Sequence, residues 1–201
     1  MGALLSHLLN INAFGSVIVF FGLPSLYLTL RAIEYSKKAI MFSIITSFPL
    51  IIIIDYIAHT TKQWLIPNSI LPFRVFGVVT IEVILWAILN LYLVIMFYEY
   101  FLDKHITKKL WHPHMKYLVA VSLFLFILFI TLYFYSPLFL NIPYFYLFWG
   151  TILLLTPIVI QMVTRPKMNM KFLKTAAYFF YLTFIYESYG ITAWLVGLSR
   201  F

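Results

Sequence analysis

The chain has 201 residues, of which 64% are hydrophobic and only 10% are charged. A soluble domain carries roughly 25% charged residues, so this composition excludes an ordinary soluble fold. Apolar stretches of about 20 residues recur instead, which is the length needed to cross roughly 30 Å of hydrocarbon. The sequence therefore predicts an all-α polytopic membrane protein, with residues 1–201 forming a single integral membrane domain.

The net charge of +8 does not indicate a nucleic-acid partner, because the basic residues lie in short segments between apolar runs. Basic residues in such places set the topology of a membrane protein and contact the headgroups of membrane lipid. The chain has no cysteine, which excludes a disulfide framework, a thiol nucleophile and a cysteine-ligated metal. We expect neither a metal nor another cofactor, since no glycine-rich dinucleotide fingerprint and no metal-ligand cluster is visible.

Six helical spans fit the hydropathy pattern, with the N-terminal "MGALLSHLLN" at the start of the first. In chain order they are expected at residues 10–31, 39–58, 73–101, 117–137, 144–163 and 174–199. Most of the 14 lysines and arginines follow the first, third and fifth spans. By the positive-inside rule those three connections are cytoplasmic, and both termini lie outside the cell membrane.

Three acidic residues fall within the expected spans, namely Asp55, Glu82 and Glu187. Glu82 follows Pro72 by ten residues, which places it about 15 Å along a helix and near mid-membrane. A charge there costs about 2.5–3.5 kcal/mol on insertion scales. We expect no lysine or arginine partner within these spans, so the carboxyl groups are expected to be protonated. A neutral acid in such a place serves either as a proton source or as a polar clasp between helices.

Aromatic and polar side chains share helical faces with two of these acids. Glu82, Trp86 and Asn90 recur every four residues, and Phe184 and Trp194 lie on one stripe with Glu187. Aromatic faces beside an acid can stabilise a cation by cation–π attraction. The alternative is chance, because 20% of the residues are aromatic.

The stretch "IIIIDYIAHTTKQWLIPNSILPFRVFGVVTIEVILWAILN" (51–90) resembles the membrane-embedded lycopene cyclases of the heterodimeric and fused type. Members carry an Asp near the end of one helix, a Trp nine residues later, a short polar loop and a Pro-Ile-Glu-Glu that opens the next helix. Asp55 and Trp64 keep that interval, and Glu82 matches the first Glu.

Thr80 and Val83 stand where the family has the Pro and the second Glu. "YESYGITAWLVG" (186–197) is similar to a second copy of the Asp-to-Trp segment, which agrees with the family's parallel duplication and gives weak halves at 1–110 and 111–201. The family's second half continues into a further helix that this sequence does not contain. We therefore expect the chain to be a degenerate or incomplete member, and a homo- or hetero-oligomer is an open alternative.

The resemblance implies redox-neutral ring closure of the ψ-end of lycopene to an ionone ring. Glu82 would protonate the terminal double bond, and Asp55, Glu187 or Glu82 itself would later accept a proton. The expected substrate is a hydrophobic isoprenoid or carotenoid drawn from the bilayer. The residues expected to contact it are Trp64, Trp86, Asn90, Phe184 and Trp194.

Other classes remain open at this point. A proton-coupled transporter or a non-catalytic membrane protein would also use intramembrane carboxylates such as Asp55, Glu82 and Glu187. A prenyltransferase would need clustered acids to hold Mg²⁺, and the pair Glu99 and Asp103 is too small a cluster. His112 and His114 in "WHPHMK" lack a nearby third ligand, which favours an interfacial loop over a metal site.

Overall fold

Long apolar helices account for most of the described chain. The computed structural model describes residues 13–63, 69, 71–103, 115–145, 147–152, 159 and 169–198. In chain order the elements are α2 (Ala13–Val17), the π-helical η1 (Ile18–Gly22), α3 (Leu23–Arg31), α4 (Ile33–Thr60), β1 (Arg74–Val75), β2 (Val79–Thr80), α5 (Ile81–Phe97), the π-helical η2 (Tyr98–Asp103), α6 (Met115–Tyr135), the 3₁₀-helix η3 (Pro137–Leu140) and α8 (Asn169–Leu198).

Three of these helices are long and apolar enough to cross a membrane: Ile33–Thr60, Ile81–Leu102 and Lys116–Tyr135. A shorter apolar helix covers Gly15–Arg31, and α8, with 30 residues, is about 45 Å long. The predicted helical class is confirmed, and the helices are compatible with an integral membrane protein. The number of six spans stays a prediction, since the fifth expected span, 144–163, lies largely outside the described residues.

The first expected span is helical but irregular. The π-helical turn Ile18–Gly22 separates α2 from α3, and Pro24 stands in the first turn of α3. Proline has no N–H, so the carbonyl of Phe20 lacks its usual partner four residues later. The wider π-turn therefore coincides with the break in the backbone ladder that Pro24 imposes.

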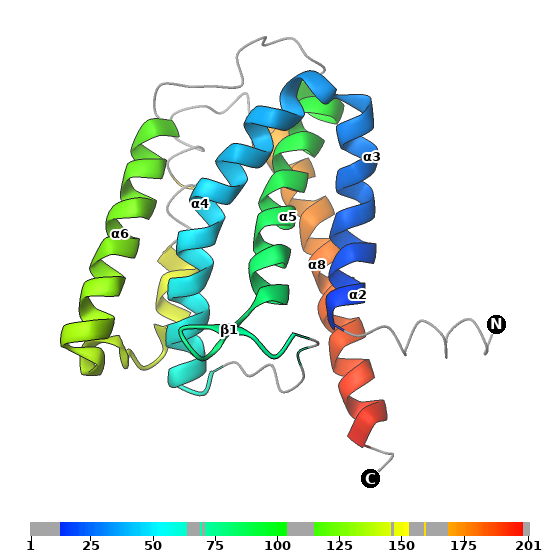
Figure 1. The fold of residues 1–201 in the computed structure, drawn as a ribbon. Helices are drawn as coiled ribbons and strands as arrows, with labels where there is room; N and C mark the ends of the chain where they lie inside the picture. Colours follow the sequence, from blue (N-terminus) through cyan, green and yellow to red (C-terminus); the bar gives the residue numbers. More distant parts are fainter. Residues whose placement is uncertain are drawn as a thin grey trace.

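Helix α4 is the central element of the bundle. It packs against α5 on one side and α6 on the other, while α3 and α8 pack against α5 (Figure 1). The hydroxyl of Ser122 on α6 donates a hydrogen bond of 3.1 Å to the carbonyl of Thr46 on α4, and both residues are buried. An interhelical hydrogen bond of this kind holds two helices together where lipid supplies no hydrophobic driving force.

The buried apolar residues form two clusters. One surrounds Phe21, Leu93 and Met96 between α3, α4, α5 and α8. The other surrounds Ile52 and Phe129 between α4, α5, the β-hairpin and α6. Trp86 of α5 packs against both clusters, so it sits at the centre of the described bundle.

The third helix begins later than the sequence predicted. Residues 74–80 form an antiparallel hairpin in which Arg74 pairs with Thr80 and Val75 with Val79, and α5 starts only at Ile81. The expectation of a helix from residue 73 was therefore wrong. The backbone reason is local: Phe76 and Gly77 have φ angles of 52° and 77°, which turn the chain, and the flanking valines favour extended conformations.

Phe76 fixes the tip of this hairpin to the helices. Its ring lies 5.3 Å from that of Phe129 and 4.9 Å from that of Tyr133, both on α6. Tyr56 of α4 contacts the same two rings at 5.2 and 5.5 Å. The hairpin is thereby held against the end of the bundle where α4 ends, toward which α2 and the last turn of α8 also point (Figure 1).

Candidate functional site

Asp55 and Glu82 lie toward the same end of the α4–α5 pair. Asp55 stands five residues before the last residue of α4, and Glu82 is the second residue of α5. Their exposed fractions are 6% and 2%. Because α5 begins at Ile81, Glu82 belongs to a first helical turn, and the expected mid-span position was wrong. The two acids are buried beneath the connection between α4 and α5, at the hairpin end.

Glu82 is held by a residue of that connection. The Ser69 Oγ lies 2.8 Å from Oε1 and 2.9 Å from Oε2 of Glu82, and 2.8 Å from the carbonyl oxygen of Leu71. A serine hydroxyl has one proton to donate and two lone pairs. If Glu82 carries a proton, it donates to Ser69 and Ser69 donates to Leu71, so that both contacts are hydrogen bonds. A carboxylate would instead have to share the proton of Ser69 with the carbonyl.

Asp55 has a basic neighbour. The guanidinium of Arg74, on the first hairpin strand, interacts electrostatically with the Asp55 carboxyl group. Nη1 of Arg74 also donates a hydrogen bond of 3.1 Å to the carbonyl of Val78, across the turn of the hairpin. The expectation that the acids lack a basic partner was therefore wrong for Asp55, because the hairpin returns Arg74 over the end of α4.

Two further polar groups are buried on either side of Glu82. Thr80, which is 1% exposed, precedes α5 without a side-chain capping bond, and Trp86 follows Glu82 by one turn. Thr80 Oγ1 and Trp86 Nε1 have no hydrogen-bond partner within the described residues. Buried polar atoms are nearly always satisfied in native proteins. These two atoms therefore mark the start of α5 as a place where a polar atom can be bound.

The residues expected around the acids are only partly brought together. Trp86 is half-buried and contacts the ring of Phe21 at 6.2 Å, and Asn90, one turn further along α5, is also half-buried. Phe184 of α8 is 61% exposed and stacks on Phe180, so it faces away from the described core.

Three predicted site residues, Trp64, Glu187 and Trp194, cannot be placed beside these. Trp64 lies outside the described residues, and so do His112 and His114. Glu187 and Trp194 belong to α8, but their side chains lie outside the described part. The neighbouring Tyr186 packs against Phe21 at 5.3 Å, so this turn of α8 approaches the α5 side of the bundle.

Sequence reasoning missed Ser69 and Arg74. Both precede the start of α5 in a segment that the sequence predicted as loop and helix, although the glycine of "RVFGVV" (74–79) is a hairpin signal. In the part of the chain that the structure describes, no group of three or more His, Asp and Glu side chains is arranged to hold a metal ion.

The chain was compared with known proteins at the level of family, sequence and structure. No protein-family model matches it, and neither curated proteins nor solved structures gave a match. A function for the chain must therefore be inferred from the described site and from the motif resemblance around Asp55 and Glu82.

Proposed function

We propose that the protein is a membrane isoprenoid cyclase that resembles lycopene cyclase and closes the ψ-end of lycopene, or of a similar polyene, to an ionone ring. The observation that carries the proposal is the burial of Glu82 and Asp55 at one end of the α4–α5 pair, with the indole of Trp86 one turn from Glu82. Two buried carboxyl groups in different surroundings are a recurrent basis for dividing acid and base roles.

In this mechanism Glu82 acts as the general acid. Its O–H proton passes to the terminal double bond of the polyene, which leaves a carbocation, and the electron pair of the neighbouring double bond closes a six-membered ring. A carboxylate then removes a proton from the ring to restore a double bond. Protons and electrons balance, so the reaction needs no oxidant or reductant. The hydroxyl of Ser69 holds the Glu82 carboxyl group in position for this transfer.

Asp55 is the candidate base for the last step. Burial disfavours the charged form of the Asp55 carboxyl group, and the positive charge of Arg74 opposes that effect, which favours Asp55 as the base. Glu187 on α8 is a second candidate, and so is Glu82 itself after it has given up its proton. Proton loss to a carboxylate returns the site to its starting charge.

The surroundings of Glu82 suit a cationic intermediate. The aromatic cluster of Tyr56, Phe76, Phe129 and Tyr133 packs the hairpin against α4 and α6 at this end of the bundle, and exclusion of water protects a carbocation from capture. Trp86 offers an indole ring one turn from Glu82, and indole gives the strongest cation–π attraction of the side chains. Trp64, Asn90 and Trp194 are the further proposed substrate contacts, whereas Phe184 faces away from the described core.

Expression in lycopene-accumulating cells tests the proposal. Chromatography of the pigments should reveal mono- or bicyclic carotenoid when the chain is present and lycopene alone when it is absent. The Glu34→Gln variant, which changes an exposed acid at the opposite end of α4, is the matched control and should keep the activity. Unchanged lycopene in cells with confirmed membrane expression, alone and with a candidate partner subunit, would refute the cyclase function.

The proposed topology has six spans in the cell membrane and both termini outside. A reporter fused after Leu198 tests it, because alkaline phosphatase is active outside and green fluorescent protein inside. A fluorescent, phosphatase-inactive C-terminus would contradict the outer position.

A second candidate function is a non-catalytic membrane protein in which the acids serve structure. The specific observation is that Ser69 and Arg74, both from the connection between α4 and α5, engage Glu82 and Asp55. Glu82 also lies among the free N–H groups of a helix start, where negative charge is stabilised. In that case Glu82→Gln would lower thermal stability without altering any polyene.

A further inference from the structure

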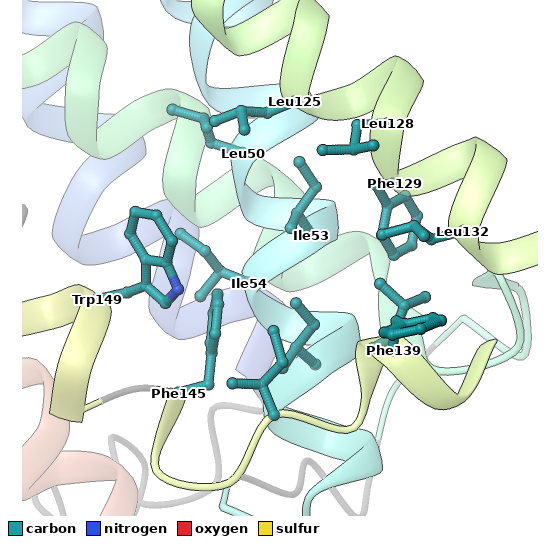
Figure 2. Close-up of a pocket in the computed structure, with 13 residues that line it drawn as sticks. Leu50, Ile53, Ile54, Leu125, Leu128, Phe129, Leu132, Phe139, Phe145 and Trp149 are labelled. Atoms are coloured by element: carbon teal, nitrogen blue, oxygen red, sulfur yellow. The ribbon is translucent and has the colours of Figure 1, made fainter. Parts of the chain in front are cut away.

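Two pockets of opposite character adjoin each other along the last turns of α4. The first is a cavity of about 180 Å³ between α4, α6 and residues 139–149 (Figure 2). Leu50, Ile53, Ile54 and Ile57 form its α4 wall, and Phe129 belongs to its α6 wall. The four α4 residues recur at helical spacing and lie on a different face of α4 from Asp55. The cavity is therefore separate from the acids.

The cavity is lined by hydrocarbon and aromatic side chains throughout. Figure 2 shows Ile53, Ile54, Leu128 and Phe139 turned toward the same space, with the indole of Trp149 at one side. A dry apolar cavity of about 150 Å³ in another protein is large enough for benzene or xenon. This cavity therefore has room for several carbons of a hydrocarbon chain and has little to offer a polar group.

The second pocket, of about 360 Å³, is polar and is built from the residues that follow. Thr60, Thr61, Lys62 and Gln63 line it from the end of α4, and Asn141 and Tyr144 line it from the segment after α6. Among the described residues that line this pocket, Lys62 is positively charged and none is acidic. The hydroxyls of Thr60 and Thr61 donate to backbone carbonyls of α4, so the positive charge of Lys62 is what this pocket offers to an anionic oxygen.

The two pockets share both of their walls. Ile57 lines the apolar cavity and Thr60 and Thr61 line the polar pocket, one turn further along the same helix. On the other wall Ile142 lines the cavity, while its neighbours Asn141 and Pro143 line the polar pocket. Leu50 to Thr61 spans about 16 Å of helix, which matches the roughly 15 Å of hydrocarbon in one leaflet of a bilayer.

We propose that these pockets together bind one phospholipid of the surrounding leaflet, with an acyl chain in the apolar cavity and its phosphate headgroup beside Lys62. Both helices that wall the cavity, α4 and α6, are candidate membrane spans, so acyl chains are the molecules available to it laterally. Lys62 is the one cation among the described residues that line the two pockets, and its charge favours an anionic headgroup over a neutral one. The site is independent of the cyclase proposal and needs no reaction.

A photoreactive phospholipid tests this site in the full-length protein. The chain is reconstituted into vesicles of phosphatidylcholine and phosphatidylglycerol that contain phosphatidylglycerol with a diazirine on one acyl chain. After illumination, mass spectrometry locates the labelled peptides. We expect label concentrated on Leu50–Ile57 and Phe139–Trp149, and Lys62→Gln should weaken labelling roughly five-fold, the effect of one lysine at an anionic surface.

A matched pair of leucines on α6 supplies the control for the cavity. Leu128 lines the cavity and Leu123 does not, yet each is 43% exposed, so either position can accept a larger side chain without unfolding the protein. Leu128→Trp should abolish the concentrated label and Leu123→Trp should leave it unchanged. Lys116→Gln, at the start of α6 at the opposite end of the bundle, is the control for lost charge and should have no effect.

Several outcomes would overturn the proposal. Label spread evenly over the exposed face of α6 and insensitive to Leu128→Trp would indicate ordinary annular lipid. If Leu128→Trp abolishes the label but Lys62→Gln leaves it unchanged, Lys62 does not bind the headgroup and that part of the proposal is wrong. Competition by geranylgeranyl diphosphate, but not by unlabelled phosphatidylglycerol, would replace the phospholipid by an isoprenoid ligand.

Discussion

The hydroxyl of Ser69 lies 2.8 Å from Oε1 of Glu82 and joins the first turn of α5 to the connection that precedes it. Ser69 belongs to the connection between α4 and α5, and Glu82 is only 2% exposed. The hydrogen bond therefore ties this connection to a buried acid. It therefore sets both the position of the Glu82 carboxyl group and part of the stability of this end of the bundle.

Ser69→Ala should lower stability by about 1–3 kcal/mol, because it leaves a buried carboxyl group without this partner. In the same variant any cyclase activity should fall, since Glu82 is no longer oriented. Thermal unfolding of the detergent-solubilised protein measures the first effect and pigment analysis the second. Ser36→Ala is the control, because the Ser36 hydroxyl bonds the Ile33 carbonyl at the exposed start of α4. Equal unfolding temperatures for Ser69→Ala and the unaltered chain would contradict this assignment.

Asp55 and Arg74 should be energetically coupled. Asp55→Asn and Arg74→Gln are each expected to destabilise the protein, and the double variant should lose less than the two single losses added together, by about 0.5–3 kcal/mol. The reason is that the Arg74 guanidinium acts electrostatically on the buried Asp55 carboxyl group, so that either substitution removes the same interaction. Chemical unfolding of the four proteins gives the coupling energy. Strict additivity would show that the two groups do not interact.

Gly77 should resist substitution for a conformational reason alone. Its φ is +77°, and a Cβ added there would meet no atom within 4 Å. Gly77→Ala should therefore cost about 1–2 kcal/mol through the left-handed backbone and nothing through collision. Gly150 is helical, has no left-handed φ and also meets open space, so Gly150→Ala should leave the unfolding temperature unchanged or raise it slightly. Equal effects of the two substitutions would rule out this backbone explanation.

Ser122 should make a small contribution to the contact between α4 and α6. Its bond to the Thr46 carbonyl is buried, and such interhelical bonds in membranes average about 0.6 kcal/mol with a maximum near 1.7 kcal/mol. Ser122→Ala should destabilise the protein within that range. Thr131→Ala removes a hydroxyl that bonds only within α6, to Ile127, and should have less effect. The order of the two unfolding temperatures is the test, and a reversed order contradicts the assignment.

The sequence was most informative where hydropathy alone decides structure. Runs such as "LIIII" before Asp55 predicted a long apolar helix. The ends of α4 and α6 lie within several residues of the ends of the expected spans. Hydropathy could not separate the hairpin from α5, because Val75, Val78 and Val79 are as apolar as a helix residue would be. The choice between strand and helix there depends on the turn at Phe76 and Gly77.

The partners of the acids were beyond prediction for a related reason. Arg74 reaches Asp55 only because the hairpin folds back, and Ser69 reaches Glu82 only because α5 starts at Ile81. Aromatic stripes were equally ambiguous, since side chains facing lipid and side chains facing the core are both apolar. Trp86 belongs to the core while Phe184 is exposed, although both were predicted from the same helical spacing.

The most direct measurement is the pigment profile of lycopene-accumulating cells that express the Glu82→Gln variant. This substitution keeps the size of the side chain and the means to hydrogen-bond Ser69 but removes the transferable proton. The account predicts cyclic carotenoid from the unaltered chain and from Glu34→Gln, and only lycopene from Glu82→Gln at equal membrane expression. Cyclic product from Glu82→Gln at the level of the unaltered chain would contradict the assignment of Glu82 as the acid.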